Sequence, residues 1–359
     1  MKSLQIGDLT ARYPIIQGGM GVGVSLAGLS SAVANQGGIG VISTVAIHLV
    51  VFNEIGKNYK EDSIRALREE IQKAKKLTQG ILGVNIMVAL SNFAELVKTS
   101  IEEKIDIIFS GAGLPLDLPG FLKGMNSKTK LVPIVSSARA ARIIIKKWKE
   151  HYDYVPDAIV VEGPLAGGHL GFKKEQIFHE DFQLEKLIPE VVEEARLFEK
   201  EYNRTIPVIA AGGIYTGEDI LKFIKLGAAG VQMGTRFVTT IECDASDEFK
   251  QAYLDAKKED IIIIDSPVGM PGRALKSPFL INASNGLNTP TSCPYKCIRT
   301  CDFRTAKYCI GNALVYAQQG KLDNGFAFVG ANVYKNDKII SVKELFETLI
   351  SEYELAEKS

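Results

Sequence analysis

The chain has 359 residues, and its 42 Lys and Arg residues balance its 42 Asp and Glu residues, so its formal net charge is zero. This balance argues against a nucleic acid or a charged membrane surface as a partner. The longest apolar runs, such as 261–264, are too short to cross a bilayer, and the first residues contain no signal-peptide core. Because five cysteines are an odd number in such a chain, we expect a cytoplasmic protein without disulfides.

Short apolar segments alternate with amphipathic ones along the first 240 residues. The apolar segments predict strands at 14–20, 39–43, 82–88, 106–110, 130–136, 158–162, 207–211 and 230–233. The segments between them predict helices at 26–35, 63–77, 93–103, 139–150, 184–202 and 216–226, with Ser63 as the N-cap of the second. Strands that are apolar along their whole length are typical of a parallel sheet covered by helices. Eight such units predict an α/β fold, a (β/α)8 TIM barrel.

The alternation stops after Phe237. Residues 241–311 contain a predicted helix at 246–258, the apolar run 261–265 and a segment rich in Pro, Gly, Asn and Cys. We expect this region to be a small inserted lid subdomain over the mouth of the barrel formed by residues 1–240. Residues 312–359, with a predicted helix at 342–353, are expected to pack back on the barrel.

The predicted strand ends exclude several chemistries, because the active site of such a barrel lies at the C-terminal ends of its strands. These ends carry glycines, small hydroxyl residues and amides. No lysine stands there for a Schiff base, and we find no His-x-His or carboxylate cluster for a catalytic metal. Close paired carboxylates for glycoside hydrolysis are also missing.

Two glycine-containing pairs follow the last two predicted strands, Gly212-Gly213 after the seventh and Gly234-Thr235 after the eighth. Loops at these places form the usual phosphate site of this barrel, because glycines let backbone N–H groups approach a dianion. The mouth therefore suits a large planar cofactor that carries a phosphate. The motif Gln17-Gly18-Gly19-Met20 would back its ring, and Asn85 and Ser136 would donate to its heteroatoms.

The sixth predicted strand runs into the loop Glu-Gly-Pro-Leu-Ala-Gly-Gly-His-Leu-Gly (162–171), which presents His169 among glycines. An unperturbed histidine titrates near pH ~6.5, so His169 is available as a neutral base or hydrogen-bond donor at pH 7. A structural loop histidine is the alternative. His48 follows the second strand and is a weaker candidate, whereas His151 and His179 lie in charged surroundings and are expected to be solvated.

The chain resembles the flavin-dependent nitronate monooxygenase family, formerly called 2-nitropropane dioxygenases, which also includes flavin-type enoyl-acyl-carrier-protein reductases. The resemblance rests, in order, on the segments 14–20, 83–87, 162–171, 207–214, 231–237 and 266–275. It implies an FMN-binding barrel with a small lid domain, and it suggests His169 as the catalytic histidine. By position it also suggests FMN contacts at Gly18, Gly19, Met20, Asn85, Ser136, Gly167, Gly212, Gly213, Gly234 and Thr235.

The resemblance leaves two activities open. The first is a nitronate monooxygenase that oxidises alkyl nitronates with O2, and the second is an enoyl-thioester reductase that takes electrons from NAD(P)H. Relatives of both kinds tend to carry an acidic residue where this chain has Leu165. A flavin- or nucleotide-binding sensor is a third alternative. An inosine-monophosphate-dehydrogenase-like enzyme is disfavoured, because the loop 163–182 has no cysteine. We expect a small-molecule substrate, with a homodimer as one candidate assembly.

Two further features stay open. Cys293, Cys297, Cys301 and Cys309 are spaced by four, four and eight residues, unlike the usual Cys-x-x-Cys pairs of zinc or cluster sites. Structural thiols are the preferred interpretation, with a metal or iron–sulfur site and a redox thiol pair as alternatives, whereas Cys243 stands apart and is expected in the core. Arg273 either meets an anionic substrate or forms a structural salt bridge.

Overall fold

The computed structural model describes residues 1–52, 58–293 and 295–359. Its centre is a closed barrel of eight strands, and every neighbouring pair is parallel. Around the barrel the strands follow the order β10 (Val208–Ala211), β11 (Gly230–Met233), β3 (Ile15–Gln17), β4 (Ile39–Ser43), β5 (Ile81–Met87), β6 (Ile107–Gly111), β7 (Lys130–Val135) and β8 (Ile159–Glu162). The predicted (β/α)8 barrel is therefore confirmed.

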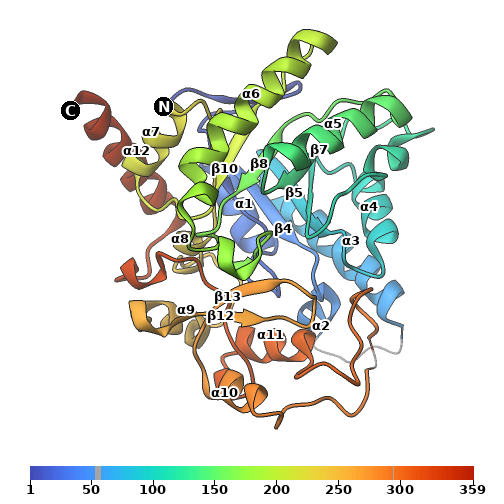
Figure 1. The fold of residues 1–359 in the computed structure, drawn as a ribbon, viewed down its shortest axis with the longest axis vertical. Helices are drawn as coiled ribbons and strands as arrows, with labels where there is room; N and C mark the ends of the chain where they lie inside the picture. The colour runs from blue at the N-terminus through green and yellow to red at the C-terminus, as the bar shows by residue number, and fades with distance from the viewer. Residues whose placement is uncertain (53–57, 294) are drawn as a thin grey trace.

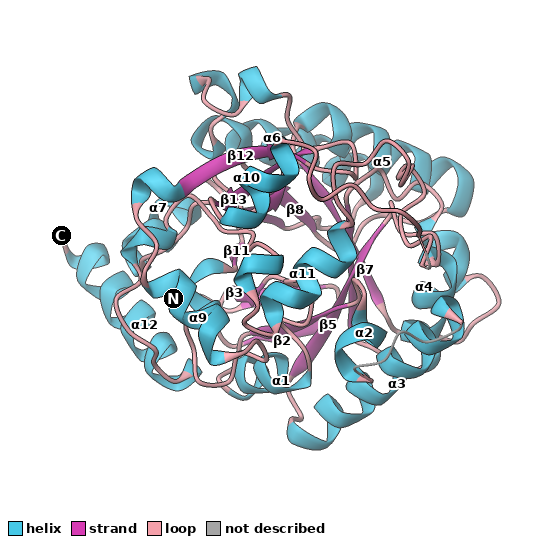
Figure 2. Ribbon diagram, turned by 90° about the horizontal axis from the view of Figure 1, so that it is seen from below, coloured by secondary structure: helices cyan, strands magenta, loops and turns pink. Residues whose placement is uncertain are grey.

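Helices form a ring around the strands (Figure 2). They are α1 (Ala27–Asn35), α3 (Tyr59–Leu77), α4 (Phe93–Glu102), α5 (Ala138–Tyr152), α6 (Leu184–Tyr202), α7 (Gly217–Lys225) and the C-terminal α12 (Val342–Lys358), which packs on α7 and α1. Ser137 and Thr216 cap α5 and α7 by accepting the N–H groups of Ala140 and Asp219. In the described part of the chain, no helix is long and apolar enough to cross a membrane.

Helix α3 begins four residues earlier than predicted, so the prediction that Ser63 is its N-cap is wrong. The charged residues before Ser63 form its first turn, where Glu61 and Asp62 complement the helix dipole. Ser63 is buried inside the helix. Its Oγ donates to the carbonyl of Tyr59 at 2.6 Å and lies 3.2 Å from Nδ1 of His48, which belongs to the short helix α2 (Ile47–Val51).

A hairpin that the sequence did not predict, β1 (Leu4–Ile6) and β2 (Leu9–Ala11), closes the N-terminal end of the barrel. Leu4 and Ile6 are buried in the same apolar cluster as the inward-facing strand residues, among them Ile16, Phe109 and Val160. The barrel interior is therefore a packed core. Only its C-terminal end is left open for a site.

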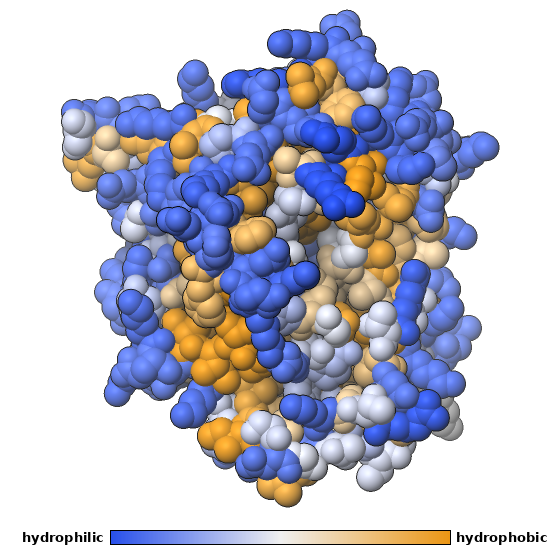
Figure 3. All heavy atoms as spheres, in the orientation of Figure 1, coloured by the Kyte–Doolittle hydropathy of each residue, from blue (hydrophilic) through white to orange (hydrophobic). Residues whose placement is uncertain are grey.

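The predicted lid region lies at one end of the barrel (Figure 1). Its elements are α9 (Asp247–Leu254), β12 (Ile261–Asp265), β13 (Pro271–Leu275) and α10 (Pro278–Ser284), and α11 (Ile310–Gln318) begins at its predicted end and continues into the region 312–359. Strand β13 pairs with β12 on one side and, on the other, with the two-residue strand β9 (Gly168–His169) in the loop after β8. The face shown in Figure 3 is mostly hydrophilic, with an apolar patch over β12, whose isoleucines are half-buried. The lid is thus hydrogen-bonded to the loop after β8 that carries His169, residues 162–171, which we call the histidine loop.

Candidate active site

A cavity of about 260 Å³ lies at the C-terminal ends of the barrel strands. Most of the predicted site residues line it, namely Gly18, Gly19, Met20, Asn85, Gly167, His169, Gly212, Gly213, Gly234 and Thr235. The predicted residue Ser136 is not in this lining, and its Oγ lies against Gly171 behind the histidine loop. Phe249 and Tyr253 of the lid helix α9 also line the cavity, so barrel and lid both contribute to it.

The backbone itself requires glycine at the two positions after β10, in addition to the predicted need for close approach to a phosphate. Gly212 and Gly213 have φ angles of 96° and 82°, which L-residues rarely adopt. A Cβ on Gly213 would lie 2.8 Å from the Cβ of Leu165, and one on Gly212 would lie 2.9 Å from the carbonyl oxygen of Gly163. The loop after β8 therefore packs directly on the loop after β10. Leu165 fills that contact.

The segment 328–332 reaches both predicted phosphate loops, which no motif in the sequence signalled. The N–H of Gly330 donates to Oγ1 of Thr235 at 3.2 Å, and Nδ2 of Asn332 donates to the carbonyl of Gly213 at 2.6 Å. Because the hydroxyl of Thr235 accepts this bond, its own proton stays free to donate. A segment far along the chain thus fixes the two loops relative to each other.

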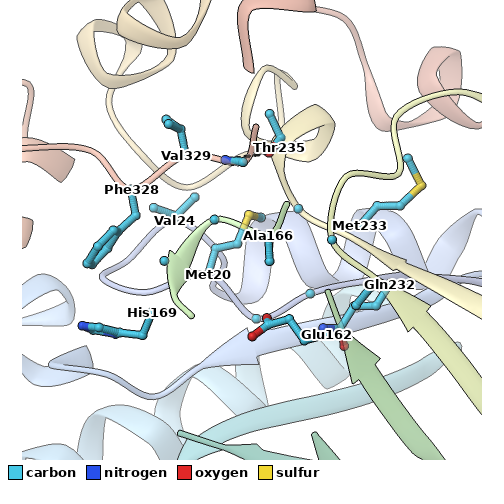
Figure 4. A pocket seen from close by; sticks show the side chains of 18 of the residues that line it. Met20, Val24, Glu162, Ala166, His169, Gln232, Met233, Thr235, Phe328 and Val329 are labelled. Atoms are coloured by element: carbon cyan, nitrogen blue, oxygen red, sulfur yellow. Dashed lines mark hydrogen bonds between the residues drawn. The ribbon is translucent and has the colours of Figure 1, made fainter. Parts of the chain in front are cut away.

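Four polar side chains in the lining lack a hydrogen-bond partner among the residues that the structure describes: Ser43, Asn85, Glu162 and Gln232. The Oγ of Ser43 is completely buried. Burial raises the pKa of Glu162 to about 7. Glu162, Gln232 and His169 come from different elements of the pocket wall (Figure 4). Because unpaired polar groups in a cavity cost free energy, this set is suited to a ligand with several heteroatoms.

His169 lies where the histidine loop meets the lid. It pairs with Gly272 of β13, and its Nε2 lies 2.6 Å from Oγ of Ser266 in the turn between β12 and β13. Its ring meets that of Phe328 edge to face, at 5.0 Å between centroids (Figure 4). Burial lowers the pKa of His169 to about 4, so the imidazole is neutral at pH 7.

The other histidines do not reach the cavity. His48 is buried beside Tyr59, with 5.0 Å between the ring centroids, and burial lowers its pKa. His151 and His179 are exposed, as predicted for solvated residues.

Arg273 lies outside the lining and holds the histidine loop in place. Its guanidinium is buried, and Nη1 donates to the carbonyl oxygens of Pro164 and Ala166 at 2.5 and 2.7 Å. No carboxylate among the described residues pairs with it, so bonds to backbone carbonyls take the place of the predicted salt bridge, while the contact with an anionic substrate stays a prediction. Burial lowers its pKa to about 10, which leaves it charged at pH 7.

A family model and a similar protein both point to the same family for this chain. The family model described as nitronate monooxygenase matches residues 2–352. A probable nitronate monooxygenase of Staphylococcus haemolyticus is 30% identical, over 76% of this chain and 78% of that protein. A Mycobacterium tuberculosis (3aS,4S,5R,7aS)-5-hydroxy-7a-methyl-1-oxo-octahydro-1H-indene-4-carboxyl-CoA dehydrogenase is 28% identical over 76% of this chain, and the match spans only 66% of that longer relative.

Two solved structures share the architecture over nearly the whole chain. FabK from Thermotoga maritima superposes with a TM-score of 0.74 at 28% identity, covering 97% of this chain and 94% of that one. Nitroalkane oxidase from Streptomyces ansochromogenes superposes with a TM-score of 0.73 at 20% identity, covering 97% of both chains. The second likeness supports the fold alone.

Proposed function

The chain belongs to the nitronate monooxygenase family of oxidoreductases, and we propose that it is an FMN-dependent enzyme that oxidises alkyl nitronates with O2. One observation carries the proposal. A glycine-lined cavity at the open end of the barrel contains unpartnered polar side chains and one neutral histidine, His169. Such a site binds a flat polar ligand through backbone and amide groups and places a second molecule against the imidazole.

The residues of the cavity fit FMN. The backbone around Gly212, Gly213 and Gly234, with the free hydroxyl proton of Thr235, would hold the phosphate. Gly18, Gly19 and Met20 would lie along the ring, with Asn85 as a donor to its heteroatoms, while contacts from Ser136 and Gly167 stay predictions. When bound, FMN supplies the two-electron redox chemistry, and the protein supplies orientation, a dry site and hydrogen bonds.

The low pKa of His169 favours a substrate that is already an anion. An imidazole whose conjugate acid has a pKa of about 4 is a weak base toward the α-carbon of a neutral nitroalkane. It remains a good hydrogen-bond partner, and an anion beside it would raise its pKa toward neutrality. Because Nε2 contacts Ser266, Nδ1 is the nitrogen left for the substrate. We therefore assign His169 the role of orienting the nitronate.

An NAD(P)H-dependent enoyl-thioester reductase is the second candidate. The 28% identity to FabK over nearly the whole chain favours it, because FabK is an enoyl-acyl-carrier-protein reductase. In that reaction His169 would hydrogen-bond the thioester carbonyl. The same low pKa counts against this activity, because a neutral imidazole is a poor proton donor at pH 7.

Flavin content tests the shared part of both candidates. The purified protein is expected to be yellow, to release FMN on denaturation and to rebind it stoichiometrically. Gly213→Val is expected to lose FMN, because the new side chain would collide with Leu165 of the loop after β8 and displace the predicted phosphate loop that carries Gly213. The exposed Gly124→Val serves as the control, because Gly124 has a similar φ of 78° and so the same backbone strain, but no atom lies within 4 Å of its Cβ position. A protein that neither contains nor binds FMN would contradict the proposal.

A further inference from the structure

The cavity has an apolar side in addition to the polar groups at its strand ends. Figure 4 shows Phe328 and Val24 on the same side as His169, away from Glu162 and Gln232. Six apolar or aromatic side chains of the lining form what we call the apolar side: Val22, Val24, Phe249, Tyr253, Leu314 and Phe328. The cavity therefore offers two chemically different surfaces to the molecules that it binds.

Phe328 lies directly against the histidine loop. Its ring meets the imidazole of His169 at 5.0 Å between centroids, with 62° between the ring planes. The same ring covers Gly272, the residue of β13 that pairs with His169. A Cβ on Gly272 would lie 2.7 Å from Cε1 of Phe328, so a side chain at this place would push the ring away. Glycine in β13 thus lets a phenyl ring lie beside the imidazole.

Neighbouring groups hold Phe328 in this position. Oη of Tyr253 donates to the carbonyl of Phe328 at 2.5 Å, and Ala274 of β13 forms a β-bridge with Phe328. The ring of the buried Phe326 packs edge to face on that of Phe328, at 5.0 Å between centroids. A surface that is already ordered loses little conformational entropy when a ligand binds against it.

The ring of Phe328 is only partly covered by the protein. Phe328 is half-buried and lines the cavity, whereas Phe326 is fully buried. Apolar area that is open to a cavity contributes to affinity when an apolar group of a ligand covers it. The predicted FMN contacts lie at the glycine loops and the strand ends, which leaves Phe328 and His169 for the second molecule.

The lining is poor in charge. Among the described residues that form it there is no lysine or arginine, and Glu162 is the only acidic residue. A substrate with one negative charge can place that charge beside His169. A second negative charge, at the far end of the substrate, would lose water without gaining a cationic partner. The lining therefore favours an anion whose remaining part is apolar.

We propose that Phe328 is a specificity-determining residue and that the substrate is a nitronate with an apolar chain on the carbon bound to nitrogen. This inference rests on the proposed function, in which Nδ1 of His169 holds the nitronate group. The chain then lies along the phenyl ring, and a carboxylate at the end of the chain is disfavoured. Burial of one methylene group strengthens binding about fourfold, so three additional methylene groups should give at least about tenfold.

Steady-state oxidation of three nitronates tests the substrate class. We expect kcat/KM to be about tenfold higher for hexyl-1-nitronate than for propyl-1-nitronate, and about tenfold lower for propionate-3-nitronate. In Phe328→Ala the hexyl-to-propyl ratio should fall about tenfold, whereas Phe328→Leu, which keeps an apolar side chain, should retain most of it. Phe178→Ala, at an exposed phenyl ring outside the lining, is the control and should keep the full ratio.

Binding of fatty carboxylates to the oxidised, FMN-loaded protein separates this inference from the proposed function. A carboxylate is a planar anion like a nitronate, but it cannot reduce the flavin. Followed by flavin absorbance, octanoate is expected to bind about tenfold more tightly than pentanoate, and Phe328→Ala should remove the difference. Failure of every nitronate to reduce the flavin would overturn nitronate oxidation, while the carboxylates still report on Phe328. Equal affinity for the two carboxylates in the unmodified protein, or a chain-length preference that persists or grows in Phe328→Ala, would overturn the role of Phe328.

Discussion

Nε2 of His169 and Oγ of Ser266 lie 2.6 Å apart, although 97 residues of sequence separate them. The same Oγ accepts the N–H of Val268 at 3.3 Å, so its hydroxyl proton is free to point at the imidazole. If Ser266 donates, Nδ1 carries the ring proton and is a donor toward the cavity. The lid turn therefore controls which form of His169 a substrate meets.

Replacing His169 by asparagine is expected to keep FMN bound and to lower turnover with propyl-2-nitronate by about 10². The amide keeps a hydrogen-bonding group but cannot match the position of Nδ1. Steady-state kinetics and flavin content measure the two effects. His179→Asn, at an exposed site, is the matched control. Unchanged turnover in His169→Asn would remove the imidazole from the mechanism.

Replacing Ser266 by alanine is expected to lower kcat about tenfold, because the imidazole loses the bond that fixes its orientation and tautomer. The pH profile should change as well, since a group that hydrogen-bonds the neutral imidazole is lost. Ser266→Thr keeps the hydroxyl and is expected to restore most of the activity. A threonine variant as impaired as the alanine variant would argue for a packing effect instead.

Replacing Arg273 by methionine is expected to lower the free energy of unfolding by about 2–4 kcal/mol, because two buried carbonyls lose a charged donor. The loop after β8 should loosen and FMN affinity should fall with it. Urea unfolding and FMN titration measure these effects. Arg304→Met, at an exposed ion pair, is the control. A variant that is fully stable but no longer binds the anionic substrate would point back to the direct contact that we first considered.

Glu162 should give substrate binding a pH dependence. Its pKa of about 7 means that it is neutral below pH 7 and negative above, where it repels a nitronate. We expect KM to rise roughly fivefold from pH 6 to 8, a Coulomb effect of about 1 kcal/mol, and to stay flat in Glu162→Gln.

The stability of the flavin-free protein gives an independent check on Glu162. Between pH 4.5 and 7 its folded form binds more protons than its unfolded form, so its contribution to the free energy of unfolding falls as the pH rises. His169 acts oppositely, because its pKa is lowered. The difference between wild type and Glu162→Gln isolates the carboxyl. A difference that does not change with pH would show that the pKa of Glu162 is ordinary.

The barrel could be predicted from sequence because its strands are continuous apolar runs that end in glycines. The glycine pairs and His169 could be located by position at these strand ends. The hairpin β1–β2 was missed because two three-residue strands carry little periodicity. Ser63 was assigned as an N-cap because the charged residues before it were taken for a loop. Those residues form the first turn of α3, so Ser63 lies inside the helix.

Long-range contacts account for the rest of what sequence could not predict. Asn332 reaches Gly213 across 119 residues, and Ser266 reaches His169 across 97, through segments without a recognisable motif. Arg273 could be singled out but not assigned, because its partners are backbone carbonyls that any sequence has.

Anaerobic mixing of the FMN-loaded protein with propyl-2-nitronate, followed by flavin absorbance, tests the central claim most directly. Because His169 is neutral and suited to an anion, the nitronate is expected to bleach the flavin rapidly, and NADH alone is not. Admission of O2 should then restore the colour with release of nitrite. Bleaching by NADH but not by the nitronate, with recovery on addition of an enoyl thioester, would contradict nitronate oxidation and support the reductase.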